Sequence, residues 1–600
     1  MTANQPVRVW APHASLVTVH LRAPGSTADA VATVRDMSPE RDGWWVGPSV
    51  PAGTDYAFAV DGHGPFPDPR SAWQPAGVHG FSRVFDASAH AWGDAAWQGI
   101  EARGAVTYEV HVGTFTPAGT LDAIVGHQLK DLARRGIRML ELMPVAAFPG
   151  NRGWGYDGVA LYSVHEAYGG PAALQRLVDA AHRAGIGVCL DVVYNHLGPD
   201  GNYLGQYGPY FTDAHETPWG WAVNLDQEGS AGVREFIIDN ALRWFEDFHV
   251  DALRLDAVHA LVDDSPVHIL AELSERTAAL AQRLGRPLSL IAESDENLPA
   301  TVTPVGQTAP DGISGRGMTA QWADDVHHAL HAYLTGERHG YYVDFGSIET
   351  LDKAYREVFV HNGTMSTFRG RRWGAPVPAD MDRRRFVVFA SNHDQVGNRA
   401  LGDRPASSLS PGAQAASLAL VLLSPFTPML FMGEEYGETR PFMFFTDHDE
   451  PLGAAVSAGR MNEFAGHGWE ALYGATVHIP DPQDRDTFMR SKLGAGIAAT
   501  TSTQSEIAEW FDTVMEAREL TLQPDVWQRF PAGAYELSAR QLVMTGPVEV
   551  RANLSDAPMP ITTEVIAVFG VKGSTTALTE LPPDAVALID SVATARSTPL

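Results

Sequence analysis

Four short segments, spread over about two hundred residues of this sequence, each place a carboxylate or a histidine at the end of an apolar run. They occupy residues 191–196, 251–256, 290–293 and 386–394. In a (β/α)8 barrel, catalytic groups come from the C-terminal ends of several different strands. Four such runs in succession therefore predict a barrel whose strand ends share one site.

The segments around these runs alternate between strand-like and helix-like patterns. Strand patterns cover residues 105–112, 137–142 and 187–194, and helical patterns cover residues 121–135 and 172–184. Gly136 and Gly185 stand where helix C-caps belong, directly before strands. This alternation is typical of βαβ units and a parallel sheet. Counting the units as far as residue 520 gives roughly eight, so we expect an α/β fold, a (β/α)8 TIM barrel.

The patterning changes near both ends of the chain, which is too long for one simple core. Residues 1–100 show short alternating strands between glycines and prolines, and they predict an N-terminal β-sandwich of the carbohydrate-binding or early-set type. Residues 101–520 form the predicted catalytic barrel, with an irregular insertion around residues 303–385. Residues 521–600 return to short strands and predict a C-terminal antiparallel β-domain.

Composition narrows the possible partners and the compartment. The formal charge of −29 argues against nucleic acid or an anionic membrane as a partner, because both need basic patches. Residues 413–433 carry almost no charge, but Pro425 and Pro428 interrupt them, which favours a buried helix, a loop and a final barrel strand over a membrane span. Cys189 is the single cysteine, which excludes an intramolecular disulfide and predicts a small core residue. No secretory signal is visible, so we expect a cytoplasmic protein, with no cofactor and no obligate protein partner.

Three of the four strand ends supply an acid, and together these acids match the groups that hydrolyse a glycosidic bond. In the strand before Asp256, Arg254 points to the same face, and a neighbouring guanidinium keeps a carboxylate ionised, as a nucleophile must be. Glu293 follows an apolar strand, where burial raises a carboxyl pKa and suits a general acid. Asp394 can bind sugar hydroxyls and stabilise developing positive charge. Alone, Asp256 would more often belong to a structural ion pair with Arg254, and Glu293 would more often be a strand-end cap.

Other polar residues of the same runs are candidate substrate ligands. His196, His393 and Asn392 offer hydrogen bonds for hydroxyls of the reacting sugar, and we expect no metal because no zinc-type spacing accompanies the histidines. Tyr156 offers an aromatic face for stacking on a sugar, with Asp157 beside it. Asp191 and Asn195 could brace a loop or hold a structural cation, and bracing is the favoured interpretation.

These runs resemble the α-amylase superfamily (glycoside hydrolase family 13), whose four motif regions they match in order and spacing over residues 105–520. The resemblance implies that Asp256 is the nucleophile, Glu293 the acid/base and Asp394 the transition-state stabiliser of a retaining double displacement. It also implies a set of residues that line the subsite of the attacked sugar. These residues are Arg254, His196, His393 and Tyr156.

Finer features resemble the trehalohydrolase branch of the superfamily, whose members hydrolyse the α-1,4 bond next to the terminal trehalose of maltooligosyltrehalose. The stretches that carry this resemblance are residues 67–71, 77–80, 108–117, 198–203, 217–220 and 256–259. Many superfamily members carry Lys-His after the nucleophile segment, where this chain has His259 and Ala260. His259 therefore falls on the side of the leaving sugars, and Trp219 is a candidate wall there. The implied substrates are maltooligosyltrehalose and maltooligosaccharides.

Three alternatives stay open at this point. A glycogen branching enzyme has a similar N-terminal module and barrel, but usually different residues around the first and fourth motifs. A debranching enzyme would attack α-1,6 bonds with the same three acids. A non-catalytic glucan-binding protein is the alternative from another class, although inactive barrels normally lose one of the acids.

Overall fold

The computed structural model describes residues 4–27, 29–464, 470–473, 477–494, 500–523, 525–571 and 578–597. Eight parallel strands close into a barrel in the order β9–β10–β11–β14–β15–β16–β19–β20, with β20 pairing back to β9. Their bounds are β9 Thr107–Val110, β10 Met139–Leu142, β11 Gly187–Val192, β14 Ala252–Leu255, β15 Ser289–Ala292, β16 Ala320–Trp322, β19 Phe386–Phe389 and β20 Thr427–Phe431. The predicted TIM barrel is confirmed.

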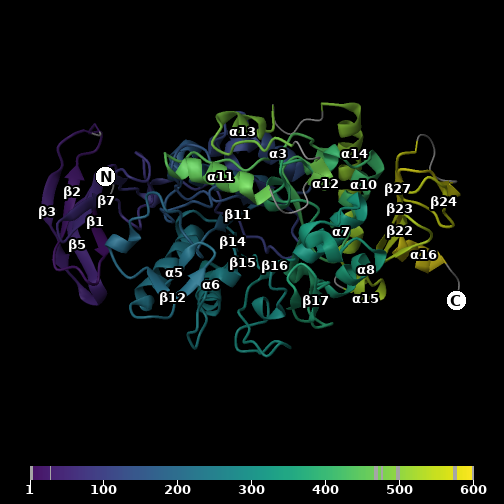
Figure 1. The fold of residues 1–600 in the computed structure, drawn as a ribbon, viewed down its shortest axis with the longest axis horizontal. Helices are drawn as coiled ribbons and strands as arrows, with labels where there is room; N and C mark the ends of the chain where they lie inside the picture. Colours follow the sequence, from purple (N-terminus) through teal and green to yellow (C-terminus); the bar gives the residue numbers. More distant parts are fainter. Residues whose placement is uncertain are drawn as a thin grey trace.

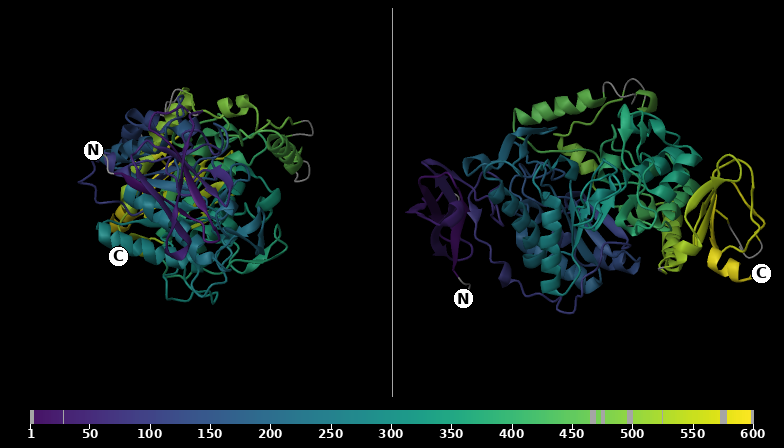
Figure 2. Two further views of the ribbon diagram at one scale, coloured as in Figure 1. Left: turned by 90° about the vertical axis from the view of Figure 1, so that its left-hand side faces the viewer. Right: turned by 90° about the horizontal axis from the view of Figure 1, so that it is seen from below.

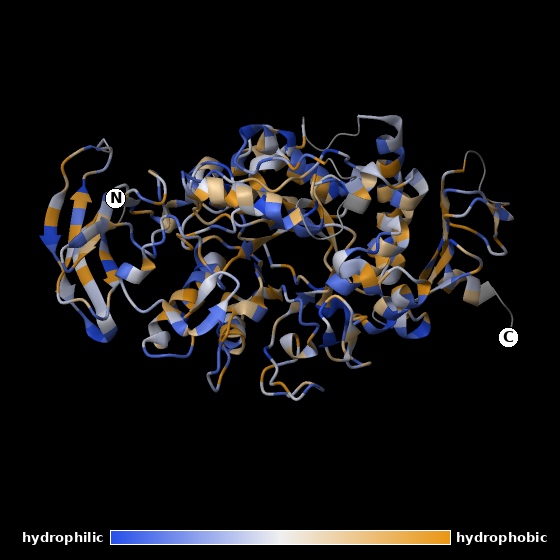
Figure 3. Cartoon of the chain, in the orientation of Figure 1, coloured by the Kyte–Doolittle hydropathy of each residue, from blue (hydrophilic) through white to orange (hydrophobic). Residues whose placement is uncertain are grey.

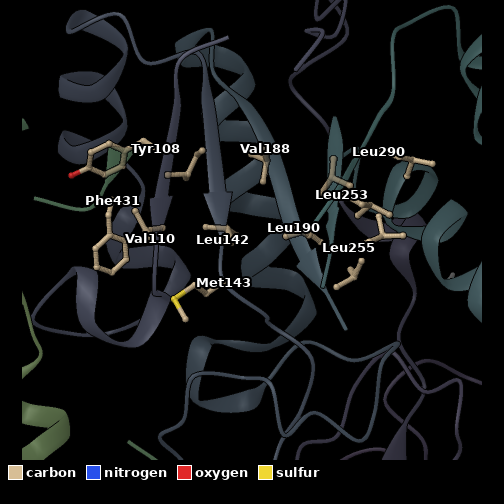
Figure 4. Close-up of a cluster of buried hydrophobic side chains, with 14 of the residues drawn as sticks. Tyr108, Val110, Leu142, Met143, Val188, Leu190, Leu253, Leu255, Leu290 and Phe431 are labelled. Atoms are coloured by element: carbon tan, nitrogen blue, oxygen red, sulfur yellow. The ribbon is translucent and has the colours of Figure 1, made fainter. Parts of the chain in front are cut away.

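Alternate side chains of the barrel strands serve two different cores. Cys189 and Ile291 point into the barrel and belong to one buried cluster with Trp322. Their neighbours Leu190 and Leu290 belong to the core outside the barrel wall, shown in Figure 4. Strands that are buried on both faces have near-continuous apolar sequences, which is why these runs are recognisable without alternation. Cys189 is buried as predicted.

Helices alternate with the barrel strands along the chain. In chain order they are α1 Val112–Phe115, α2 Leu121–Ile124, α3 His127–Arg134, α4 Gly170–Ala184, α5 Ser230–Asp247, α6 Ile269–Leu284, α7 Asp324–Thr335, α8 Ile348–Glu357, α9 His393–Gly397, α10 Pro411–Leu422, α11 Leu452–Phe464, α12 Glu470–Tyr473, α13 Arg485–Arg490 and α14 Ser502–Arg518. Gly185 ends α4 in the left-handed conformation with φ 82°, as the sequence predicts. The helix expected over residues 121–135 is divided at Gly126, whose φ of 104° no helix accommodates.

The first part of the chain forms two antiparallel sheets at one end of the molecule, at the left in Figure 1. One contains β1 Gln5–Trp10, β4 Ser38–Pro39 and β5 Trp44–Val50, and the other contains β2 Val17–Arg22, β3 Thr33–Asp36, β6 Asp55–Val60, β7 His63–Phe66 and β8 Ser82–Arg83. Hydrophobic and hydrophilic residues alternate along these strands (Figure 3), as expected where only one face is buried. Trp10 packs edge-on against Tyr210 of the barrel domain, with ring centroids 5.4 Å apart.

The C-terminal part forms a separate antiparallel module at the opposite end of the molecule, as Figure 1 and the right-hand view of Figure 2 show. Its five-stranded sheet has the order β21–β22–β23–β27–β25, and β24 pairs with β26. The bounds are α15 Val526–Arg529, β21 Gly533–Glu536, β22 Gln541–Thr545, β23 Val548–Asn553, β24 Met559–Pro560, β25 Ala567–Phe569, β26 Glu580–Leu581, β27 Ala585–Asp590 and α16 Ser591–Ser597. Terminal antiparallel modules around a barrel are therefore present, while the boundaries at residues 100 and 520 stay predictions.

The interval 303–385 is only partly an insertion. It contains the sixth barrel strand β16 and the helix α7 that follows it, and then α8 and a hairpin of β17 Thr364–Ser366 and β18 Arg371–Trp373. Three strand residues are too few to show a pattern, which is why the sequence hides β16. Residues 413–433 fold as predicted into buried α10, a loop and β20; the sequence predicts the strand at residues 429–432, and β20 spans Thr427–Phe431. In the described part of the chain, no helix has the length and apolarity needed to cross a membrane.

Candidate active site

The three predicted acids meet at the C-terminal face of the barrel. Asp256 directly follows β14, Glu293 directly follows β15, and Asp394 lies in α9 beyond β19. Backbone hydrogen bonds extend the strand ladder to the first two, since the Asp256 amide donates to Val192 and the Glu293 amide donates to Leu255. Their positions are thus set by barrel pairing rather than by loop conformation.

Arg254 is fully buried and joins the acids of three neighbouring strands. Its Nη1 lies 2.7 Å from an Asp191 carboxylate oxygen and 3.0 Å from Asp256, while its Nη2 lies 3.4 Å from Glu293. The guanidinium also lies 4.3 Å from the ring centroid of Trp322. Burial lowers the pKa of Arg254, but the surrounding carboxylates outweigh burial and raise it well above its usual value. A permanent positive charge therefore lies beneath the site, as the alternation of β14 predicts.

Asp256 is held in place by a second donor. The side-chain amide of Asn195 donates to both the Asp256 carbonyl and its carboxylate, at 2.8 Å each. The next residue, Ala257, has a φ of 39°, which is rare for a side chain with Cβ and marks local strain beside the acid. This geometry supports the bracing interpretation for Asn195.

Glu293 lies in the environment that a general acid needs. Burial raises its pKa, Arg254 lowers it, and Asp256 and Asp394 raise it again, so that the pKa is about 7. Its carboxylate accepts the Ala257 amide at 2.5 Å, which fixes the rotamer. Asp295, two residues after Glu293, pairs with Arg369 at 3.0 Å.

His393 is held from below by Glu109, an acid that sequence reasoning missed. One Glu109 oxygen contacts the His393 Nδ1 at 2.5 Å, and the other accepts the His393 backbone amide at 2.9 Å. Burial lowers the pKa of His393, but Asp394 and Glu109 raise it more, to about 9. The Nε2 of the imidazolium therefore donates to the hydroxyl of Tyr156, 2.7 Å away.

Tyr156 completes a continuous chain of hydrogen bonds across the site. Its hydroxyl donates to Asp191 at 2.6 Å, and Asp191 accepts from Arg254. The Tyr156 ring lies parallel to His393, with centroids 5.2 Å apart. The residues link in the order Glu109, His393, Tyr156, Asp191, Arg254 and Asp256. Tyr156 thus positions charged neighbours as well as offering the predicted ring face.

His196 and Trp219 form a stacked pair above the site. The rings are 4.3 Å apart and within 6° of parallel, and Trp219 is 50% exposed. Trp219 belongs to the turn of a hairpin of β12 Phe211–Thr217 and β13 Gly220–Val223. The His196 ring nitrogens contact the Asn195 side chain at 2.5 Å and the Tyr156 carbonyl at 3.0 Å. The structure therefore brings the predicted wall residue against a predicted sugar ligand.

The other predicted ligands lie nearer the edge. Asn392 caps α9 by accepting the Gln395 amide at 2.7 Å, and its buried Nδ2 has no partner among described residues. Asp157 pairs with His448 at 3.3 Å, which raises the pKa of that histidine. His259 is exposed on the helical turn after the Asp256 strand and makes none of these contacts.

Two further acids lie in or near the site without a sequence signal. Glu141 of β10 is buried inside the barrel, where burial and then Glu109 raise its pKa to about 8. Asp324, the first residue of α7, has its pKa raised well above the usual value by burial and by Glu293 and Asp394. Glu141 lies within the predicted strand 137–142 and not at its end, and Asp324 follows β16, which is too short to show a pattern.

One group of described residues has metal-type spacing, and it lies outside the acid cluster. Ligand atoms of His215, Asp226 and Asp264 all lie within 4.8 Å of one another. The Asp226 carboxylate already accepts from His215 at 2.8 Å and from the Asp264 backbone at 2.9 Å. These hydrogen bonds account for the clustering without an ion.

Known proteins of similar sequence and fold belong to the class of enzymes that this arrangement of acids indicates. The family model for the α-amylase catalytic domain matches residues 94–229. Malto-oligosyltrehalose trehalohydrolase of Rhizobium sp. (strain M-11) is 46% identical, over 97% of this chain and 97% of that protein. The enzyme of the same name from Mycobacterium tuberculosis (strain H37Rv) is 45% identical, over 93% of this chain and 94% of that protein.

A solved structure covers the same length. It is a protein of Salmonella typhimurium assigned as an α-amylase, 32% identical, with a TM-score of 0.84 over 98% of both chains. The similarity extends through both terminal modules and not only through the barrel. The chain therefore belongs to the malto-oligosyltrehalose trehalohydrolase family, within the α-amylase superfamily of glycosidases.

Proposed function

We propose that this enzyme hydrolyses the α-1,4-glucosidic bond next to the terminal trehalose of maltooligosyltrehalose, releasing trehalose and a shortened maltooligosaccharide. One observation carries the proposal: relatives of that name match nearly the whole chain, and in this chain Asp256 and Glu293 contact one buried arginine while the charge of Asp394 acts on Glu293. The reaction would release trehalose from glucan chains that carry it at one end.

In the first step, the Asp256 carboxylate attacks the anomeric carbon of the glucose unit that precedes trehalose. The bond from that carbon to the trehalose oxygen breaks, and Glu293 transfers its proton to the leaving oxygen. A pKa of about 7 supports this role, because a substantial fraction of Glu293 is protonated near neutral pH and its conjugate carboxylate is still accessible for the second step. Arg254 keeps Asp256 ionised, as attack requires.

In the second step, water replaces Asp256. Glu293, now a carboxylate, takes a proton from a water molecule, and the water oxygen bonds to the anomeric carbon as the ester to Asp256 breaks. Both carboxyl groups return to their starting forms. Asp394 would bind hydroxyls of the attacked sugar and stabilise its positive charge in both transition states, while the protonated His393, whose ring nitrogens contact Glu109 and Tyr156, would position Tyr156 beside it.

The leaving trehalose would lie on the side of Trp219 and His259. The exposed face of Trp219 supports this placement, because sugar C–H faces stack on aromatic rings and its other face is taken by His196. Asp157, Asn392 and Tyr156 would contact the glucan side or the attacked sugar.

Product analysis tests the proposal. The enzyme is incubated with maltooligosyltrehalose and, separately, with a maltooligosaccharide of equal length. Free trehalose from the first and slow cleavage of the second would establish it. Branched or lengthened products would indicate a branching enzyme, cleavage of α-1,6 bonds a debranching enzyme, and no product from any glucan a binding protein. The cytoplasmic location and the lack of protein or nucleic-acid partners stay predictions from the sequence.

A further inference from the structure

The first two barrel strands carry acidic residues side by side on their inner face. Glu109 of β9 and Glu141 of β10 are Cα partners in the parallel ladder, and the exposed fraction of each is 1%. Glu141 faces inward because Met139, two residues before it, belongs to the cluster inside the barrel. Two carboxylates at this spacing, removed from water, cannot both stay charged unless each has positively charged or donor partners.

Glu109 has such partners. Its two carboxylate oxygens contact the ring and the backbone amide of the protonated His393. Glu141 differs, because neither of its carboxyl oxygens has a hydrogen-bond partner among the described residues. Its Cα partner on the other side is Cys189 of β11, whose thiol is only a weak donor. The negative charge in this layer therefore belongs to Glu109.

Glu141 keeps its proton at neutral pH, since an unpaired buried carboxylate is costly. Burial raises its pKa, as do the charges of Glu109 and Asp191, while the positive charges of Arg254 and His393 lower it, so that the pKa is about 8. These four charged groups face Glu141 from β9, β11, β14 and α9. A neutral carboxyl group is a hydrogen-bond donor, with one proton to share.

A buried acceptor with an unused position lies in the same layer. Asp191 and Arg254 are Cα partners in β11 and β14. The Oδ2 of Asp191 accepts from Tyr156 and Arg254, but its buried Oδ1 has no partner among the residues that the structure describes. The Nε of Arg254 is likewise buried without a partner in the described part of the chain. Arg254 in turn contacts Asp256.

We propose that Glu141 is a positioning residue of the reaction. As a neutral carboxyl group, it supplies the hydrogen bond for the unused oxygen of Asp191 through a bridging water molecule, and so keeps Arg254 in place beneath Asp256. A buried water molecule typically makes about three hydrogen bonds to polar groups that need partners, and the Glu141 hydroxyl, Asp191 Oδ1 and Arg254 Nε are three such groups. The inference rests on the proposed function, because it assigns Glu141 to the step in which Asp256 attacks.

The test compares two substitutions of similar size at one position. Glu141→Gln keeps a neutral donor, whereas Glu141→Leu has none. Gln321→Leu is the matched control. Gln321 of β16 is also fully buried with an amide that has no partner among the described residues, but its neighbours Ala320 and Trp322 face the barrel interior, so that its own side chain faces outward. We measure kcat and KM with maltooligosyltrehalose between pH 6 and 9, and thermal unfolding of each variant.

We expect Glu141→Leu to lower kcat by about 10-fold with little change in KM, the effect of one buried acceptor that loses its donor. Glu141→Gln should match the wild type at pH 7 and exceed it by about 5- to 10-fold at pH 9, because about nine-tenths of Glu141 is ionised one pH unit above its pKa. Gln321→Leu should match the wild type throughout.

Three outcomes would overturn the inference. The first is a wild-type kcat in Glu141→Leu, and the second is an equal loss of kcat in Glu141→Leu and Glu141→Gln. The third is a ratio of the Glu141→Gln rate to the wild-type rate that stays constant between pH 7 and 9. This ratio decides the question even where Glu141→Leu does not fold.

The proposed function is decided separately. If the wild type cleaves another glucan in place of maltooligosyltrehalose, the same rates are compared on that glucan. If it cleaves none, infrared difference spectra between pH 7 and 9 decide the state of Glu141 without activity. The wild type should lose one more carboxyl C=O band than Glu141→Gln, because Glu293, Glu434 and Glu435 titrate in this range in both proteins. Identical difference spectra would overturn the inference.

Discussion

Glu109 contacts His393 twice, through the ring Nδ1 and through the backbone amide, although the two residues are 284 positions apart in the sequence. This pairing decides the direction of the hydrogen bonds above it. With His393 protonated, its Nε2 donates to Tyr156, so the Tyr156 hydroxyl is free to donate to Asp191. With His393 neutral, Nε2 would accept, and Tyr156 would turn its proton away from Asp191.

We expect Glu109→Gln to lower kcat/KM by about 10- to 100-fold at pH 8, because the amide no longer holds the His393 proton, and to lower it less at pH 5.5. Rate profiles between pH 5 and 9 check this. Because the pKa of His393 is raised from 6.5 to about 9 in the folded protein, its protonation should also stabilise the wild type. This stabilisation is complete at pH values below 6.5 and is lost as the pH rises through 9. An equal defect in rate at both pH values would contradict the role of Glu109.

The wild-type rate should fall on the alkaline side with an apparent pKa of about 7, because Glu293 must be protonated to act as the acid. The Asp394→Asn variant removes one of the charges that raise this pKa. Its residual activity should therefore fall at a lower pH than the wild type, which a profile of kcat/KM measures. If the alkaline side of the Asp394→Asn profile moves to higher pH instead, a group other than Glu293 controls it.

We expect Asp256→Asn, Glu293→Gln and Asp394→Asn each to reduce turnover by several orders of magnitude without unfolding the barrel. Each change keeps the size of the side chain and removes the charge or the proton that the reaction uses. Circular dichroism and thermal unfolding confirm the fold. If Asp256→Asn keeps near wild-type turnover, the assignment of Asp256 as the nucleophile is wrong.

Trp219→Ala should raise KM for maltooligosyltrehalose by about 10-fold, with a smaller effect on kcat, because loss of one stacked ring removes roughly 1–2 kcal/mol of binding. Trp221→Ala is the matched control. Trp221 is 68% exposed on the adjacent strand of the hairpin, and Trp219 is the one that lies on His196. Equal effects of the two changes would argue against a specific wall.

Gly232→Ala should destabilise the protein by about 1–3 kcal/mol, because the added methyl group would lie 2.1 Å from the Trp10 ring, where the N-terminal module contacts α5. In α11, the added methyl group of Gly459→Ala meets no atom within 4 Å. That control should be neutral or stabilising, as usual for alanine in a helix. Thermal unfolding of both variants distinguishes a packing effect from helix propensity.

The sequence could predict those parts of the site that follow from strand geometry. Alternation in one strand placed Arg254 beside Asp256, and an apolar strand predicted the raised pKa of Glu293. It could not predict the partners of His393, because Glu109 lies in β9, the first barrel strand, which reaches the end of the chain's barrel only by pairing with β20. Residues 320–322 formed a strand too short to recognise, so a barrel strand was assigned to an insertion.

The closure of the barrel by β20 and β9 has a consequence for how the enzyme comes into being. Glu109 lies on the first barrel strand and His393 follows the seventh, while the acids come from strands between them. During synthesis, a chain that ends before His393 cannot bring these groups together. Recovery of catalysis is therefore a late and stringent reporter of refolding, one that secondary-structure signals should precede.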